Sequence, residues 1–479
     1  MAPSFVHASG ALLLLVVLSY LFSAFVTPLR KIPGPFLARF TGLYRLSMVS
    51  KGDAPLNYRA IHRKYGPIVR VGPNHVSISD PNMIPEIYGI GSKYLKTEFY
   101  TTMSVSYKGS DMHSMFSERD GPQAKRLKSQ VAQLFSMTNM KNYEPHVDDC
   151  SAIFTLAMEQ AAKKGEVVDL GKWLQWYAFD VIANISFQRK FGFMERKEDV
   201  DNMIEGLDIA QQYIKVIGQY PHLNKYVMGN KLVFYILSKI VTMKDVAALF
   251  IEITEDQLKL YKTDTNKQQR TDLLGQLRLK RDKSDSMTSR DEMNHLLATL
   301  LAGSDTTAIT LRACFYYLIK TPTAYDKLVR EIDEAHHQGQ LSSMITFDEA
   351  LQLNYLQAVL KEAMRMHPGV GFPLERHVPK GGAHLCGNFI PAGTIVGMVP
   401  PVIHENRDIF GADADIFRPE RWIEATPEQL KSMDRTMLAE SLYHKCYATS
   451  ISNGHPPNPS GRHMLLGFGS SLVLMFDFI

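Results

Sequence analysis

The chain has 479 residues, 45% of them hydrophobic and 21% charged, and its formal net charge at pH 7 is only +4. Such a composition is typical of a globular protein, and the small net charge gives no reason to expect nucleic acid as a partner. The cysteines are four in number, without C-x-x-C spacing: Cys150, Cys314, Cys386 and Cys446. This pattern excludes a disulfide-rich scaffold and a structural zinc site, and it favours a reducing compartment.

The N-terminal segment is uncharged and apolar. Residues 1–29 contain no Asp, Glu, Lys or Arg, and Ala11–Val26 is almost wholly apolar. With its flanks this run reaches the ~20 residues that a helix needs to cross a bilayer, and Arg30 and Lys31 predict a downstream body on the cytoplasmic side. The alternative is a cleaved signal peptide, but that class carries its positive charge before the apolar run. We therefore expect a single-pass transmembrane anchor at 1–29 and a stiff, proline-rich hinge at 30–36.

Downstream of the hinge the pattern is mostly helical. His62–Pro81 is an exception, because Gly-Pro and Gly-Pro-Asn turns punctuate two short stretches that are typical of strands. Residues 263–290 are strongly charged. We interpret them as a solvated connection.

The clearest predicted helix begins near Ser289. Ser289 and Glu292 match an S-x-x-E capping box, and apolar residues then recur with the spacing of one buried helix face. These apolar residues are Met293, Leu296, Leu297, Leu300 and Leu301. The helix continues into "AGSDTT", where Asp305 and Thr306 place polar groups in a buried helix, which is costly unless they are used or satisfied. Two interpretations stay open: a functional pair, or a Thr bonded to the preceding turn and an Asp paired with a surface cation.

A second predicted helix, "YLQAVLKEAMRMHP", carries Glu362 and Arg365 three residues apart, close enough for an ion pair, and Pro368 ends it. Further on, Arg421 in "FRPERW" is expected to reach the same carboxylate. A carboxylate shared by two arginines makes a stronger network than an isolated pair.

Together and in this order, these motifs resemble the cytochrome P-450 superfamily, in the membrane-anchored microsomal form common in fungal secondary metabolism. The resemblance covers Pro33 to Leu438 and also includes "PAGTIVG" at Pro391–Gly397. It implies a mainly α fold with a small β region, with the haem domain at 37–438 after the transmembrane helix. It further implies haem b, an NADPH-cytochrome reductase as partner, a lipophilic small-molecule substrate, and the endoplasmic reticulum membrane with the body facing the cytoplasm.

The same resemblance assigns roles to individual residues. Asp305 and Thr306 are the expected catalytic pair that delivers protons to bound oxygen, and Ala302 and Gly303 form the groove beside the haem. Glu362, Arg365 and Arg421 are the expected structural ion triad, and Arg376 in "LERHVP" is a haem-propionate partner. On an earlier helix the usual aromatic or His and the Arg four residues later are replaced by Ala124 and Lys128, so Arg126 and Lys128 are the candidates for a second propionate contact.

The haem loop of the family carries an Arg and, two residues later, the Cys whose thiolate is the axial iron ligand. "LGFGSSLV", Leu466 to Val473, keeps both glycines of that loop but has Ser471 at the Arg position and Val473 at the Cys position. Shifting the frame places Met475 at the ligand position. We therefore expect no thiolate metal ligand, and haem binding by this chain is in question.

The ending is also expected to be aberrant. Residues 439–479 contain an insertion before the loop, and the family's final helix and C-terminal hairpin are expected to be missing. This pattern suggests a retained intron, a frameshifted allele or a mistaken gene model. The sequence thus predicts a monooxygenase of lipophilic secondary metabolites, such as an alkaloid or terpenoid, that is inactive as written. Two alternatives stay open: an active monooxygenase whose C-terminus is misrepresented, and a haem-free protein that binds apolar ligands.

Overall fold

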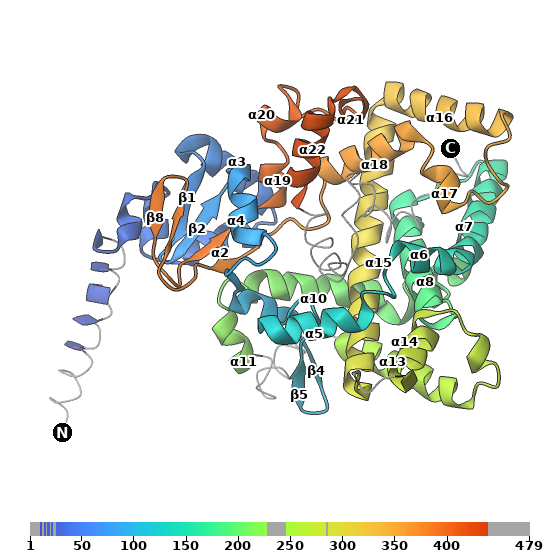
Figure 1. The fold of residues 1–479 in the computed structure, drawn as a ribbon, viewed down its shortest axis with the longest axis horizontal. Helices are drawn as coiled ribbons and strands as arrows, with labels where there is room; N and C mark the ends of the chain where they lie inside the picture. Colours follow the sequence, from blue (N-terminus) through green and yellow to red (C-terminus); the bar gives the residue numbers. More distant parts are fainter. Residues whose placement is uncertain are drawn as a thin grey trace.

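The computed structural model describes residues 10–11, 14–15, 17–19, 21–22, 25–227, 246–283 and 286–438. The residues expected to form the haem loop, Val473 and Met475 among them, lie outside this part. Figure 1 shows a sheet-containing region on one side and a larger helical region on the other, with helix α15 running through the helical region. The prediction of a mainly α fold with a small β region is confirmed.

A five-stranded sheet joins the N-terminal part of the chain to the segment after residue 375. Its strand order is β1-β2-β9-β6-β3, and the two strands expected within His62–Pro81 are β1 and β2, which pair antiparallel. A Cβ atom at Gly34 would overlap the backbone oxygen of Arg70, so a glycine lets the proline-rich segment lie directly on β1. The strands are β1 (Ile68–Gly72), β2 (His75–Ile78), β3 (Leu95–Lys96), β4 (Val105–Tyr107), β5 (Ser110–Met112), β6 (Arg376–His377), β7 (Ala383–Leu385), β8 (Asn388–Ile390) and β9 (Ile395–Gly397).

Helices make up most of the remaining described chain. The longest is α15 (Ser289–Lys320), and α8 (Leu170–Phe187) packs extensively along it. The other α-helices are α2 (Leu43–Ser50), α3 (Ala54–Tyr65), α4 (Ile84–Tyr88), α5 (Gly121–Val131), α6 (Met137–Met140), α7 (Glu144–Lys164), α9 (Phe193–Arg196), α10 (Met203–Ile217), α11 (Asn224–Val227), α13 (Val246–Thr263), α14 (Leu273–Lys283), α16 (Pro322–His337), α17 (Phe347–Ala350), α18 (Asn354–Met366), α19 (Pro400–Ile403), α20 (Arg407–Phe410), α21 (Arg421–Glu424) and α22 (Pro427–Thr436).

Helix α15 forms where the sequence predicts it, but its cap lies one residue earlier. Thr288 is the N-cap and Asp291 the third residue of the capping box, rather than Ser289 and Glu292. The Asp291 carboxylate accepts hydrogen bonds from the backbone N–H and the hydroxyl of Thr288. Glu292 instead turns into the protein and pairs with Arg281, so its carboxylate is unavailable to cap the helix.

The prediction of a solvated connection at 263–290 is wrong for its middle part. Residues 273–283 form helix α14, whose Leu273, Leu274 and Leu277 are buried in a hydrophobic cluster with residues of α15. The many charged residues around these leucines obscured their apolar spacing in the sequence. Arg278 and Arg281 do not face only solvent, because both pair with the buried carboxylate of Glu292.

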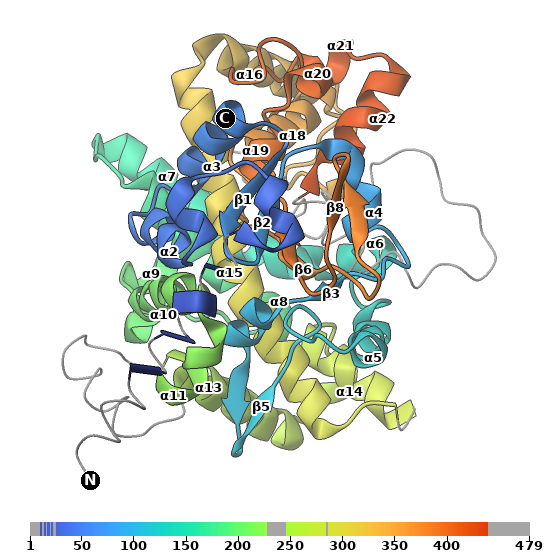
Figure 2. The ribbon, with the colours of Figure 1, turned by 90° about the vertical axis from the view of Figure 1, so that its left-hand side faces the viewer.

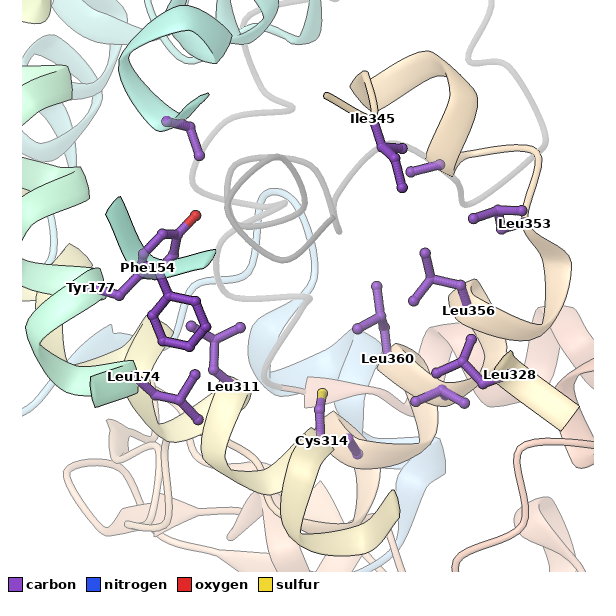
Figure 3. Packing of buried hydrophobic residues seen from close by; sticks show 14 of the residues in the cluster. Phe154, Leu174, Tyr177, Leu311, Cys314, Leu328, Ile345, Leu353, Leu356 and Leu360 are labelled. Carbon is purple, nitrogen blue, oxygen red and sulfur yellow. The ribbon is translucent and has the colours of Figure 1, made fainter. Parts of the chain in front are cut away.

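The largest hydrophobic cluster lies between α7, α8, α15, α16 and α18. Figure 3 shows Phe154, Tyr177 and Leu311 on one side of this cluster and Leu356 and Leu360 on the other. The predicted apolar faces of α15 and α18 supply many of these side chains. Packing of this kind fixes where the polar residues on the remaining faces of α15 point.

In the described part of the chain, no helix combines the length and the apolar character that crossing a membrane requires. The transmembrane helix expected at 1–29 is therefore not supported. Several residues of that segment lie outside the described residues.

Candidate functional site

The candidate site is centred on the "AGSDTT" turn of α15. Ala302 is exposed and Thr306 half-buried, and because they are four residues apart they lie on the same helix face. The Thr306 hydroxyl donates to the backbone oxygen of Ala302 at 2.7 Å. Gly369, just after α18, borders this face, because a Cβ atom there would lie 3.8 Å from the Thr306 Cβ. The hydroxyl is thus satisfied by the preceding turn, and it lies beside the exposed Ala302.

Gly303 faces a different direction. A Cβ atom at Gly303 would lie 2.7 Å from the Cδ1 atom of Ile182 on α8. The glycine therefore lets α8 approach the α15 backbone closely, and its small size serves helix packing in this structure.

Asp305 is held by two side-chain amides. Gln175 of α8 donates to its Oδ1 atom at 3.5 Å, and Gln211 of α10 donates to its Oδ2 atom. Arg312, two turns further along α15, donates to the amide oxygen of Gln175 at 2.5 Å. This last bond orients the Gln175 amide so that its NH2 group faces the carboxylate. Burial and then the charge of Asp305 raise the pKa of the neighbouring Asp208.

The structure brings together the three members of the expected ion triad. Glu362 accepts from Nε and Nη2 of Arg365 at 2.9 and 2.8 Å, and from Nε of Arg421 at 2.9 Å. The indole N–H of Trp422 donates to the same carboxylate at 2.9 Å. The exposed fractions of Glu362, Arg365 and Arg421 are 0%, 1% and 3%. Burial alone raises the pKa of Glu362, but its bonds and charge interactions with the two arginines outweigh this and hold that pKa below its usual value.

His404 is a residue that the sequence reasoning missed. It is fully buried and exchanges two bonds with the triad, because its Nδ1 lies 3.2 Å from the Arg365 backbone oxygen and Arg365 donates to the His404 backbone oxygen at 2.8 Å. Its Nε2 accepts from the backbone N–H of Leu438 at 3.0 Å, so Nδ1 carries the proton. Burial lowers the pKa of His404 to about 3. His404 therefore ties the triad to the last described residue, and a lone His in "VIHEN" gives no signal for that role.

Residues 33–437 match the family model described as cytochrome P-450. A cytochrome P-450 monooxygenase of Aspergillus terreus is 34% identical over 87% of this chain and 85% of its own length. A second one, cicH of Emericella nidulans, is 35% identical over 91% and 88%, and the pisatin demethylase of Fusarium vanettenii is 32% identical over 85% and 78%. The chain belongs to the cytochrome P-450 family.

Cytochromes P-450 bind haem, and Arg376 is the residue expected to contact one of its carboxylates. Arg376 is buried in β6 and donates from Nη1 to the Tyr100 hydroxyl at 2.7 Å and to the Glu375 backbone oxygen at 2.8 Å. Its guanidinium lies 5.2 Å from the centre of the Tyr88 ring and 5.3 Å from that of Tyr100. These contacts fix the guanidinium in one place, as recognition of a carboxylate requires.

The two residues of α5 expected to contact a haem propionate, Arg126 and Lys128, are placed differently from Arg376. Arg126 forms a bidentate pair with Asp291 at the start of α15, at 2.8 and 2.9 Å. Burial alone raises the pKa of Asp291, but the Arg126 and Thr288 bonds hold it well below its usual range. Lys128 is half-buried on the same helix. The guanidinium of Arg126 is thus already occupied by a carboxylate of the protein.

The cysteines of the described chain do not offer a thiolate to the α15 face. Cys150 and Cys314 are fully buried in the largest hydrophobic cluster, where Figure 3 shows the Cys314 sulfur among aliphatic side chains. Burial raises the pKa of Cys314 to about 12. Cys386 lies in the β7–β8 turn near Asp80, and burial raises its pKa to about 11. All three thiols are therefore neutral near pH 7.

The described residues thus fit the carboxylate edge of haem but not its axial ligand position. Arg376 fits the carboxylate edge of haem, because its bonds to the Tyr100 hydroxyl and the Glu375 backbone oxygen hold the guanidinium in place. For the axial end, none of the three cysteines in the described residues fits, and that part of the chain holds no group of three or more His, Cys, Asp or Glu side chains suited to a metal ion.

Proposed function

We propose that this chain derives from a haem-thiolate monooxygenase of lipophilic secondary metabolites, and that these 479 residues do not form the thiolate centre. The placement of the cysteines carries the proposal. Cys150, Cys314 and Cys386 are neutral and packed against other parts of the protein. The sequence has Val473 where the family has its ligand, and Cys446 stands outside any glycine loop.

In an intact member of the lineage, haem supplies oxygen activation and the protein positions substrate and protons. Here the Thr306 hydroxyl lies on the face of α15 that also carries the exposed Ala302, and it can release its bond to the Ala302 oxygen to donate elsewhere. The Asp305 carboxylate is the adjacent proton carrier, and it accepts amide hydrogen bonds from Gln175 and Gln211. These residues support a proton-delivery role inherited from the lineage.

The proposed setting is that of the microsomal members of the family. The apolar N-terminal segment followed by Arg30 and Lys31 supports attachment to the endoplasmic reticulum membrane with the body in the cytoplasm. NADPH-cytochrome reductase is the proposed redox partner. The proposed substrate class is a lipophilic small molecule such as an alkaloid or terpenoid, and one relative is named as a demethylase of pisatin.

The test is the carbon monoxide difference spectrum of the reduced protein. The full chain is expressed with haem precursor, alongside an intact fungal cytochrome P-450 monooxygenase as the positive control. We expect the control to give the thiolate-type Soret band and this chain to give none. A thiolate-type band from this chain contradicts the proposal and favours an active monooxygenase. Stabilisation by apolar ligands without haem, in a thermal unfolding assay, instead favours a haem-free binding protein.

A further inference from the structure

A small hairpin stands apart from the five-stranded sheet. Strands β4 and β5 form a separate two-stranded sheet in which Tyr107 pairs with Ser110, and Lys108 and Gly109 between them have φ angles of 51° and 80°. Positive φ at both central residues is typical of the tight turns that close hairpins. Figure 1 and Figure 2 both show the hairpin projecting from the body, near the end of the molecule where α15 begins. A hairpin alone is marginally stable in water, so contacts with the body hold it in place.

Arg290, in the first turn of α15, fastens the turn end of the hairpin. Its Nη1 atom donates to the Tyr107 backbone oxygen at 3.0 Å. Its Nη2 atom donates to the backbone oxygens of Ser110 and Asp111 at 2.9 and 3.2 Å. The guanidinium also lies 5.6 Å from the centre of the Tyr107 ring. One planar, charged fork thus holds both strands, and bonds from a charged donor are stronger than neutral ones.

Tyr107 connects the hairpin to a second helix. Its hydroxyl donates to the Glu255 carboxylate on α13 at 2.8 Å. Because Arg290 lies on α15, the turn end of the hairpin bridges α13 and α15. The base of the hairpin is tied separately, since the Asn294 amide, one turn after Arg290, donates to the His113 backbone oxygen at 2.7 Å. Two sets of contacts, one at the turn and one at the base, thus hold the hairpin.

The inner side of the hairpin covers apolar side chains. Met112 of β5 is 4% exposed and belongs to a hydrophobic cluster that contains Phe250 of α13 and Leu297 of α15. Tyr107 packs against the same cluster, whereas residues 108–111 are exposed. The hairpin therefore shields apolar surface of α13 and α15 from water, and this surface becomes accessible when the hairpin detaches.

We propose that the β4–β5 hairpin is a strap, fastened by Arg290 and Tyr107, that closes the apolar cluster between α13 and α15 and opens to admit apolar molecules. The opening is local, because the Asn294 bond keeps the base attached and the largest hydrophobic cluster of the protein contains no residue of the hairpin. Segments held by few contacts open more often than the core does. The strap requires neither haem nor a thiolate, so it does not rest on the proposed function.

Tryptic cleavage after Lys108 measures how often the strap opens. A protease cuts the opened segment, and when the segment recloses quickly the rate of cleavage follows the open population. The full chain is digested without haem, and mass spectrometry follows the Lys108–Gly109 bond and, as an internal reference, the Lys380–Gly381 bond in another exposed turn. Arg290→Met and Tyr107→Phe are expected to speed cleavage at Lys108 about 10-fold or more relative to the reference, as loss of bonds that involve a charged group implies.

The dye anilinonaphthalene sulfonate tests whether the open strap exposes apolar surface. The dye fluoresces when it binds exposed hydrophobic surface. Arg290→Met and Tyr107→Phe are expected to raise its fluorescence above that of wild type, because the cluster around Met112 becomes accessible. The circular dichroism spectrum is expected to stay unchanged, since only the hairpin detaches.

Matched variants separate the strap from other causes. Lys283→Met removes an exposed cation on α14 and is expected to leave both readouts at their wild-type values. Arg290→Lys keeps the charge but loses the planar fork, and is expected to speed cleavage less than Arg290→Met. Adding Glu255→Gln to Tyr107→Phe is expected to change cleavage little further, because both remove the same contact. Should Arg290→Met fail to fold, Tyr107→Phe and Arg290→Lys carry the test.

The proposal is overturned by unchanged cleavage at Lys108 in both Arg290→Met and Tyr107→Phe. It is also overturned by equal acceleration at Lys108 and Lys380, which reports general unfolding, or by dye fluorescence that stays at the wild-type value while cleavage at Lys108 rises. A thiolate-type carbon monoxide spectrum contradicts the proposed function but leaves these readouts unaffected. The two proposals therefore fail on different measurements.

Discussion

Replacing Glu362 by glutamine tests whether the buried ion triad stabilises the fold. The substitution keeps the size of the side chain but removes its charge and turns one acceptor oxygen into an NH2 group. In the native protein the two carboxylate oxygens accept from Arg365, Arg421, Trp422 and the backbone N–H of Arg418. Glutamine cannot satisfy this set, because its NH2 group faces donors rather than acceptors.

The size of the effect follows from burial. With the Glu362 carboxylate gone, Arg365 and Arg421 remain buried with less compensation for their charges. Breaking a buried pair in this way costs about 3–5 kcal/mol, a large part of the typical ~5–15 kcal/mol of unfolding free energy. The matched control is Glu159→Gln, which removes an exposed ion pair with Lys163 on α7 and is expected to change stability little.

Urea unfolding followed by tryptophan fluorescence measures the loss, because the Trp422 indole bonds directly to Glu362. The folded-state pKa of Glu362 is lowered, so its contribution is present above the unfolded carboxyl pKa of about 4.3 and is lost as the pH falls through the folded value. The advantage of wild type over Glu362→Gln is therefore expected to narrow on acidification below about pH 4. A loss at pH 7 no larger than that of Glu159→Gln refutes the reasoning.

Three further changes probe the candidate site. Gly303→Ala places a Cβ atom 2.7 Å from the Ile182 Cδ1 and is expected to cost about 1–3 kcal/mol in urea unfolding; a second change, Ile182→Val, recovers part of it, and no recovery contradicts the packing role. Thr306→Val is expected to stay within about 0.5 kcal/mol of wild type, because the hydroxyl bonds its own helix; a larger loss shows a tertiary role. The pKa of His404 is lowered to about 3, so its contribution is complete above about pH 6.5 and falls by about 1.4 kcal/mol per pH unit below it. His404→Gln is therefore expected to lose less stability than wild type between pH 7 and pH 5, and an equal loss contradicts the assignment.

Local patterns predicted the elements that carry the site. Apolar spacing and Pro368 located α15 and α18, because a long amphipathic helix leaves a periodic signal in the sequence. The same reasoning placed the cap of α15 one residue too late, at Ser289, since both Thr288 and Ser289 can cap a helix. It also missed α14, whose few leucines are hidden among charges.

Side-chain partners were less predictable. The amides that hold Asp305 come from α8 and α10, and nothing near Gln175 or Gln211 in the sequence links them to that carboxylate. Likewise, the sequence places Gly303 in a groove motif, whereas the structure shows it beside Ile182. Both outcomes depend on which face of α15 each neighbouring helix covers, and that is set by packing between distant segments.

The sequence by itself determined the family, the order of the motifs and the residue types at the expected haem positions, Val473 included. These are properties of spacing and identity along one chain. The tertiary structure alone decided that Arg126 is occupied by Asp291 and that Lys96 lies opposite Arg376. Strand register and helix packing bring together residues hundreds of positions apart, and no local pattern encodes that contact.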